Sequence, residues 1–214
     1  MLDKTIPYKN IIMMLPGSQV AAAARPRLPE GYAFRLYVPG DEQHWARIET
    51  SVLEFDTEAA ALAYYTRIFL PYGELLQQRC VFVTDPDGLP VATATAWADE
   101  APAVGRQAIL HWVSVVPGQQ GLGLGKAVVQ RALQIFSELE PGADIYLHTQ
   151  TWSHPAIRLY RRLGFSMRKT AGTILPDGET GGRRVPPNEF CAAMEVLRGV
   201  LDEKTFADLL ESAR

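Results

Sequence analysis

The amino-acid sequence predicts an α/β protein built around one mixed sheet, and three observations carry this prediction. A strand at residues 109–116 passes through a glycine-rich turn into a helix that extends to residue 139. A second strand, at 143–150, is followed by a helix over 156–163. Two β-rich runs flank the turn-forming residues 85–88 and predict a hairpin. Strands that alternate with helices but also form hairpins indicate a sheet with both parallel and antiparallel pairs.

The composition is typical of a single globular domain. The chain has 214 residues, which is long enough for one domain with a full core. Its apolar fraction of 47% agrees with that class. The formal net charge of −3 predicts no strong attraction to nucleic acid or to an anionic membrane, so we expect neither as a partner.

Cysteine usage and the lengths of apolar runs indicate the compartment. The two cysteines, Cys80 and Cys191, suit a reducing compartment, and they belong to no Cys/His cluster that would hold zinc. No apolar run reaches the length of a membrane span, and the run at 11–15 is too short for a signal peptide. The sequence therefore predicts a cytoplasmic protein that needs no metal.

Residues 1–30 differ from the rest of the chain. The apolar run at 11–15 predicts a short added strand or a clamp across the sheet. The next residues, 16–31, are rich in Ala, Pro and Gly and predict a linker, with a mobile tail as the alternative. The sequence thus predicts an N-terminal extension over 1–30 and a single domain over 31–214. A chain that starts near Pro29 is then expected to stay folded.

The first half of the predicted domain contains one strand and two helices before the hairpin. Alternating residues predict a strand at 32–38, and helical spacing predicts a helix over 42–52. Asp56 or Thr57 is expected to cap a second helix that extends to about residue 78, and Pro71 is expected to kink or interrupt it. The segment 98–105 after the hairpin is interpreted as a loop.

The last fifty residues carry weaker signals. A strand is predicted from Phe165 through 173, and the Gly- and Pro-rich segment 175–188 is interpreted as a flexible loop. Residues 190–197 are interpreted as a last strand, with a helix as the alternative. A C-terminal helix is predicted over 203–212, with Asp202 as its cap.

The turn at residues 120–126 has the properties of a phosphate site. Free backbone N–H groups at the start of a helix point toward an anion, and glycines let a phosphate approach the backbone. A nucleotide-hydrolase loop would need Gly at 120 and Ser or Thr at 127, where the chain has Gln120 and Ala127. A dinucleotide loop would need Gly at 126, where the chain has Lys126.

Two motifs resemble the GNAT superfamily of acyl-CoA-dependent N-acyltransferases. Gln120-x-x-Gly123-x-Gly125 after a strand resembles the pyrophosphate loop of that family. The helix that ends in Leu-Tyr-x-x-Leu-Gly-Phe at 159–165 resembles its second signature. Both motifs occur in the family's order, and the resemblance covers roughly residues 32–196.

The resemblance implies a fold, an activity and partners. The expected fold is a mixed, mostly antiparallel central sheet flanked by helices. The expected activity is transfer of an acetyl group from acetyl-CoA to a primary amine by direct attack, with a small-molecule or peptide amine as acceptor. The alternative is a non-catalytic module of the same fold that binds or senses acyl-CoA. The oligomeric state stays open, with a homodimer as one option.

The resemblance also implies which residues bind CoA. The backbone at Val113 and Val115 is expected to bond the pantetheine arm, and Ser153 stands where the family often carries Asn. The pyrophosphate is expected at the backbone N–H groups of the loop, which comprises Gln120, Gly121, Gly123, Leu124, Gly125 and Lys126. The Lys126 side chain either adds a charge to a phosphate or is solvated.

The catalytic groups follow from the same resemblance. Tyr160 matches the tyrosine that often protonates the leaving thiolate, and its phenol, with a reference pKa of about 10, carries the proton at neutral pH. Its alternative role is core packing. His111 on the central strand is the expected base, and His148 on the next strand is the alternative. Both histidines can instead be structural.

Acidic residues between the first two helices are the expected acceptor site. The family shapes its acceptor pocket from this region, where the chain carries Glu54 and Asp56. The other interpretation of these two acids is a solvated turn with a helix cap.

Overall fold

A computed structural model of the chain describes residues 2–214 and contains one seven-stranded sheet in the order β2-β3-β4-β5-β6-β1-β7. The strands are β1 (Asn10–Leu15), β2 (Ala33–Leu36), β3 (Cys80–Thr84), β4 (Pro90–Ala101), β5 (Gly105–Val115), β6 (Ile145–Gln150) and β7 (Ser166–Met167), with β8 (Leu175–Pro176) and β9 (Arg183–Arg184) as a separate ribbon. The helices are α1 (Gly17–Ala23), α2 (Glu42–Ser51), α3 (Glu58–Ile68), α4 (Gly73–Arg79), α5 (Leu124–Leu139), α6 (His154–Arg162), α7 (Phe190–Arg198) and α8 (Glu203–Ser212), with short 3-10 turns at Leu70–Tyr72, Pro117–Gln119 and Thr151–Ser153. The predicted α/β class with a mixed sheet is confirmed.

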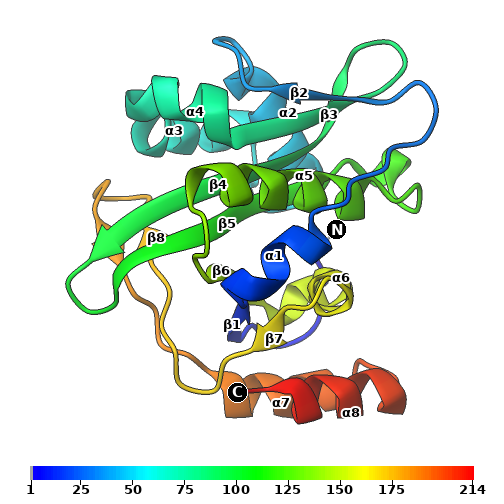
Figure 1. The fold of residues 1–214 in the computed structure, drawn as a ribbon, viewed down its shortest axis with the longest axis vertical. Helices are drawn as coiled ribbons and strands as arrows, with labels where there is room; N and C mark the ends of the chain where they lie inside the picture. Colours follow the sequence, from blue (N-terminus) through cyan, green and yellow to red (C-terminus); the bar gives the residue numbers. More distant parts are fainter. Residues whose placement is uncertain (1) are drawn as a thin grey trace.

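Two hydrophobic clusters lie on opposite faces of the sheet. Val81 and Val83 on β3 face the cluster that contains α5, whereas Phe82 between them faces the cluster that contains α2 and α3. This alternation follows from the two-residue period of a strand. Figure 1 shows α5 alongside β4 and β5, with α2, α3 and α4 above them and α7 and α8 below β7. The sheet therefore has a helical layer on each side.

The sheet opens between β5 and β6. These strands form the only parallel pair among residues 2–214, and it consists of Ala108↔Ile145 and Ile109↔Tyr146. Beyond this point the two strands share no further pairs. β5 also carries a bulge, because the four residues from His111 to Ser114 oppose only three on β4, from Thr93 to Thr95. Trp112 in the bulge adopts a left-handed φ of 52°, so the backbone around it is turned out of the regular ladder.

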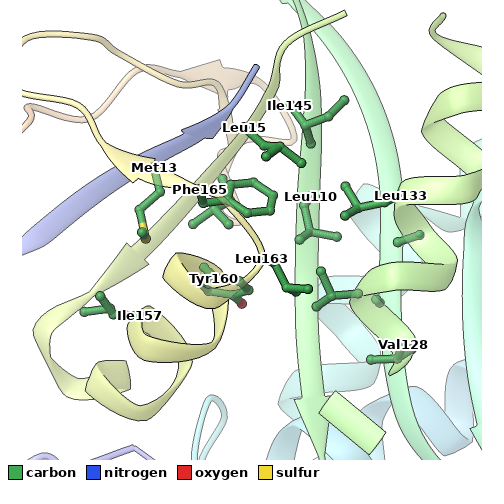
Figure 2. Packing of buried hydrophobic residues seen from close by; sticks show 14 of the residues in the cluster. Met13, Leu15, Leu110, Val128, Leu133, Ile145, Ile157, Tyr160, Leu163 and Phe165 are labelled. Atoms are coloured by element: carbon green, nitrogen blue, oxygen red, sulfur yellow. The ribbon is translucent and has the colours of Figure 1, made fainter. Parts of the chain in front are cut away.

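The N-terminal strand β1 is an interior strand of the sheet. It pairs antiparallel with β6 over its whole length and with β7 through Met13 and Met14. Figure 2 shows Met13 and Leu15 in the same cluster as Phe165 and Leu110. An added strand was one of the two predicted roles for residues 11–15. The predicted linker at 16–31 is wrong in its first part, because Ala-rich residues form α1, whose Ala23 carbonyl accepts a hydrogen bond from Gln130 Nε2 at 2.8 Å.

Removal of the N-terminal extension is now expected to unfold the protein. The five apolar residues of β1 are between 0% and 6% exposed, and a buried side chain of this kind contributes roughly 1.5–3 kcal/mol. Their sum approaches the whole stability of a typical domain, about 5–15 kcal/mol. Thermal melts followed by circular dichroism would compare the full chain with chains that start at residue 10 and at residue 29. The chain that starts at residue 10 should keep a cooperative transition, and the chain that starts at residue 29 should lose it. Similar melting of all three chains would contradict this placement of β1.

Several local predictions need correction. Residues 190–197 form the helix α7, not a strand, because Ala193, Met194 and Leu197 recur at helical spacing and are buried. The segment 98–105 is not a loop, since β4 and β5 extend through it to a tight hairpin. The predicted strand at 165–173 ends at Met167, where the chain turns to pair with the C-terminus.

Other local predictions are confirmed. Thr57 caps α3 by accepting a hydrogen bond from the N–H of Ala60, and Asp202 caps α8 in the same way. Helix α3 ends before Pro71, and α4 follows it. The segment 175–188 is mostly irregular and contains the short β8–β9 ribbon.

Candidate active site

Two cavities meet where β5 and β6 separate. The larger has a volume of about 670 Å³ and the smaller of about 360 Å³. Six residues line both cavities and define their junction: Leu2, Glu54, Val113, Ser114, Ser153 and Ala156. A ligand that fills the larger cavity can therefore reach a second molecule in the smaller one.

The larger cavity is bounded by the glycine-rich turn and the start of α5. Gly121 and Gly123 both have a φ of +83°, which favours glycine, and a Cβ added at Gly123 would meet no atom within 4 Å. Helix α5 begins without a side-chain cap and without an acidic residue in its first turn, so its free N–H groups suit an anion. The structure brings all of the predicted loop residues to this cavity: Gln120, Gly121, Gly123, Leu124, Gly125 and Lys126.

The predicted contacts to the pantetheine arm surround the junction. Val113 lines both cavities and Val115 lines the larger one. Gln120 Nε2 donates to the Val115 carbonyl at 2.9 Å, so the Gln120 side chain ties the loop to the end of β5. Ser153 lies at the junction, immediately before α6.

Tyr160 lies on the apolar face of α6 and lines the smaller cavity. Its ring packs against Phe165, with 5.9 Å between the ring centroids (Figure 2). Burial raises the pKa of Tyr160 above its ordinary value, and the charges of Glu54 and Glu49 raise it further. The phenol therefore keeps its proton near neutral pH and can donate it. Tyr160 is both a packed residue and a cavity residue.

The two strand histidines are neutral near pH 7. His111 lines the smaller cavity, and burial, followed by the charges of His148 and Arg183, lowers its pKa to about 3. Its Nε2 atom is buried and has no hydrogen-bond partner in the described part of the chain. His148 Nε2 lies 2.8 Å from Asn10 Oδ1, and burial together with Arg184 lowers its pKa to about 4.

Glu49 is the group that sequence reasoning missed. It is 0% exposed, it lines the smaller cavity, and its Oε2 accepts a hydrogen bond from Ser114 Oγ at 2.7 Å. Its Oε1 has no partner among residues 2–214. Burial raises the pKa of Glu49 well above its ordinary value, and the neighbouring Glu54 carboxylate adds to this. The signal was present in the sequence, because Glu49 follows Trp45 and Ile48 at apolar-face positions of α2.

The structure separates the two predicted acceptor-site acids. Glu54 lies at the junction of the cavities, accepts a hydrogen bond from Gln150 Nε2 at 3.4 Å, and has its pKa raised by burial. Asp56 is exposed and lines neither cavity. Asp56 immediately precedes Thr57, the residue that caps α3, and so belongs to an exposed helix start.

The N-terminal segment before β1 forms one wall of the site. Leu2 lines both cavities and donates its N–H to the Val52 carbonyl at 3.2 Å. Tyr8 lines the smaller cavity and packs edge-on against Trp152, with 5.0 Å between ring centroids. Trp152 Nε1 in turn donates to the Ile6 carbonyl at 2.7 Å. No pattern in the sequence indicated these contacts.

Residues 2–214 contain neither a membrane-spanning helix nor a metal-ligand cluster. No helix there is both long enough and apolar enough to cross a bilayer. No three side chains of His, Cys, Asp or Glu lie close enough together there to form a metal site.

Comparisons with known proteins agree with this geometry. The sequence model described as the acetyltransferase (GNAT) family matches residues 43–165, which is more than half of the chain. The chain is 29% identical over 171 residues to the mycothiol acetyltransferase of Pseudarthrobacter chlorophenolicus, covering 75% of this chain and 50% of that protein. It is 30% identical over 148 residues to the enzyme of the same name from Actinosynnema mirum, covering 67% and 48%. The chain thus spans about half the length of these curated relatives.

Solved structures share the fold. A tandem GNAT protein from the clavulanic acid biosynthesis pathway superposes with a TM-score of 0.55 at 18% identity, over 77% of this chain and 51% of that one. A GCN5-related N-acetyltransferase from Sphaerobacter thermophilus gives a TM-score of 0.53 at 24% identity, over 75% and 49%. At these identities the likeness establishes the fold alone.

Proposed function

This chain belongs to the acetyltransferase (GNAT) family, and we propose that it transfers an acetyl group from acetyl-CoA to a primary amine. One observation carries the proposal: a cavity edged by a glycine-rich helix start meets a second cavity edged by acids and a tyrosine. The larger cavity accepts CoA, with its pyrophosphate at the first turn of α5 and its sulfur at the junction. The smaller cavity accepts the amine.

Direct attack accounts for the chemistry without an enzyme nucleophile. The amine nitrogen forms a bond to the acetyl carbonyl carbon, and the bond from that carbon to the CoA sulfur breaks. The departing thiolate takes a proton from the hydroxyl of Tyr160, and the amine loses a proton to a group in the smaller cavity. Holding both reactants at the junction supplies much of the rate by proximity.

Two groups are candidates for the proton acceptor. His111 is the base that the sequence predicted, and as a neutral imidazole it has a lone pair to offer. Glu49 lines the same cavity and is favoured by its raised pKa, which makes its carboxylate a stronger base than the His111 imidazole. We therefore propose Glu49 as the proton acceptor and keep His111 as the second candidate.

The pH dependence of turnover distinguishes the two candidates. A base acts when it is deprotonated, so turnover falls as the pH drops through its pKa. If Glu49 is the base, the acidic limb of the profile of turnover against pH lies well above pH 4.5, because burial raises the pKa of Glu49. If His111 is the base, this limb lies near pH 3. At saturating amine, we expect Glu49→Gln to abolish the limb and His111→Ala to leave it in place. Loss of the limb in the His111 variant alone would assign the proton to His111.

Thiol release provides the test of the function itself. Acetyl-CoA is incubated with a panel of primary amines, and free CoA thiol is measured against a control without amine. We expect amine-dependent release and an acetylated amine in the product mixture. Tight acetyl-CoA binding without release from any amine would favour the alternative, a module that senses acyl-CoA.

A further inference from the structure

The smaller cavity carries opposite charges at its two ends. Glu54 lies at the junction with the larger cavity, and Ser114 at the same junction holds the carboxylate of Glu49. Arg184 lines the smaller cavity only, together with Leu175, Pro176 and Gly178 of the β8–β9 ribbon segment. Glu54 therefore lies at the junction and Glu49 beside it, bonded to Ser114, whereas Arg184 lies among ribbon residues in a part of the smaller cavity that the larger one does not share.

The acidic end lacks an ion-pair partner of its own. No ion pair in the described residues involves Glu49 or Glu54. Lys4 also lines this cavity and lowers the pKa of Glu54, but its ammonium is exposed and lies 5.6 Å from the centroid of the Trp152 ring. Glu49 is thus the buried carboxylate that a cationic group of a ligand would meet.

The basic end is held in place by the ribbon. Arg183 and Arg184 are adjacent residues of β9, so their side chains point to opposite faces. Arg183 forms an ion pair with Asp99 outside the cavity. Arg184 forms no ion pair or side-chain hydrogen bond among the described residues. Its charge lowers the pKa values of three residues that line the cavity, Tyr8, Tyr64 and His148.

Contacts with α3 hold the ribbon segment in place. A Cβ added at Gly178 would come within 2.9 Å of the Tyr64 ring, so the ribbon segment packs directly on that side chain. Arg67 Nη1 donates to the Gly178 carbonyl at 2.5 Å. The position of Arg184 relative to the acids is therefore set by packing, although the Arg184 side chain itself is exposed to solvent.

We infer that the acceptor is an amphoteric small molecule, in which the primary amine is accompanied by an anionic group. Its amine faces Glu49 and Glu54 at the junction, and its carboxylate or phosphate pairs with Arg184 at the far end. A guanidinium suits both anions because it offers a planar fork of donors. This inference rests on the proposed function, since it assumes that the smaller cavity holds the acceptor. A plain alkylamine would satisfy the acids but would leave Arg184 without a counter-charge.

A matched series of acceptors tests the inference. The probes are straight-chain ω-amino acids of two to six methylenes, the n-alkylamines of equal length, and 2-aminoethyl phosphate as the phosphate case. We expect the preferred ω-amino acid or the phosphate to exceed its alkylamine in kcat/KM by roughly 10-fold or more, the scale of a hydrogen bond to a charged group. Comparison of the ω-amino acids with 2-aminoethyl phosphate identifies whether the site binds a carboxylate or a phosphate.

Variants of Arg184 then assign the preference to this side chain. Arg184→Gln should raise the KM of the anionic acceptors and so remove most of their preference over the alkylamines, and Arg184→Lys should retain part of that preference. Lys204→Gln is the control, because Lys204 is exposed on α8 and its loss changes the net charge equally. An equal preference in the parent and in Arg184→Gln would overturn the inference.

A binding measurement keeps the inference separate from the proposed function. If no amine supports thiol release, the proposal of acetyl transfer is overturned. Calorimetric titration of the ω-amino acids into the parent and into Arg184→Gln then tests whether Arg184 binds the anionic group. Binding that is present in the parent and lost in Arg184→Gln supports the amphoteric ligand. Absent binding to the parent, or equal binding to both, overturns it.

Discussion

Replacing Gly123 with valine should abolish CoA binding while the protein stays folded. The position has a φ of +83° and opens onto the larger cavity, where a Cβ would meet no protein atom within 4 Å. A branched side chain there would occupy the space that we assign to the pyrophosphate and would strain the backbone. Calorimetry with CoA should show no measurable binding, with the far-ultraviolet circular dichroism of the parent retained.

The backbone strain of this change has a matched control. Gly88 lies in the β3–β4 turn, has the same φ of +83°, and also faces open space away from both cavities. Gly88→Val should therefore carry a similar loss of melting temperature and bind CoA like the parent. A folded Gly123→Val protein with parental CoA affinity would show that the loop is not the pyrophosphate site.

Replacing Tyr160 with phenylalanine should lower turnover by roughly 100-fold or more, the usual scale for a general acid. The substitution keeps the ring that packs against Phe165 and removes only the hydroxyl of this cavity residue. An interaction that is made only in the transition state affects kcat rather than binding. CoA affinity should therefore stay at the parental value, and steady-state kinetics on the same preparation provide the measurement.

Tyr65 offers the matched control for this substitution. Its ring is buried in the cluster of α2 and α3, its hydroxyl has no partner in the described chain, and it lines neither cavity. Tyr65→Phe should leave kcat unchanged. Parental turnover in the Tyr160 variant would assign Tyr160 to packing alone, and a fall in melting temperature with unchanged kcat would support the same conclusion.

Much of the binding loop could be predicted because its signals are local. A strand, a run of glycines and a helix start lie within eighteen residues, and together they predict a turn whose free N–H groups suit an anion. The face of α6 that carries Tyr160 is likewise set by helical spacing over two turns. The caps at Thr57 and Asp202 were predicted for the same reason, since a cap needs only its own first turn.

Elements whose partners are distant in sequence could not be placed from local patterns. The apolar run of β1 is compatible with an edge strand, a clamp or an interior strand, and only its pairing with β6 and β7 decides among them. A strand's N–H and C=O groups carry no information about which strand they will pair with. The same limit explains why the interpretation of residues 190–197 as a strand is wrong. The apolar face of α7 packs against β1, which lies far away in the sequence.

The sequence by itself determined the α/β class, the glycine-rich anion loop and the resemblance to acyl-CoA-dependent transferases, because each depends on residues that are neighbours along the chain or share one helix face. The tertiary structure alone decided which acids and which arginine line the smaller cavity. Glu49 is held beside the cavity by its hydrogen bond to Ser114, which lies 65 residues away on β5. Arg184 lines the cavity because the β8–β9 ribbon segment packs on α3. Long-range packing sets the burial and the field at each of these charges, and therefore their chemistry.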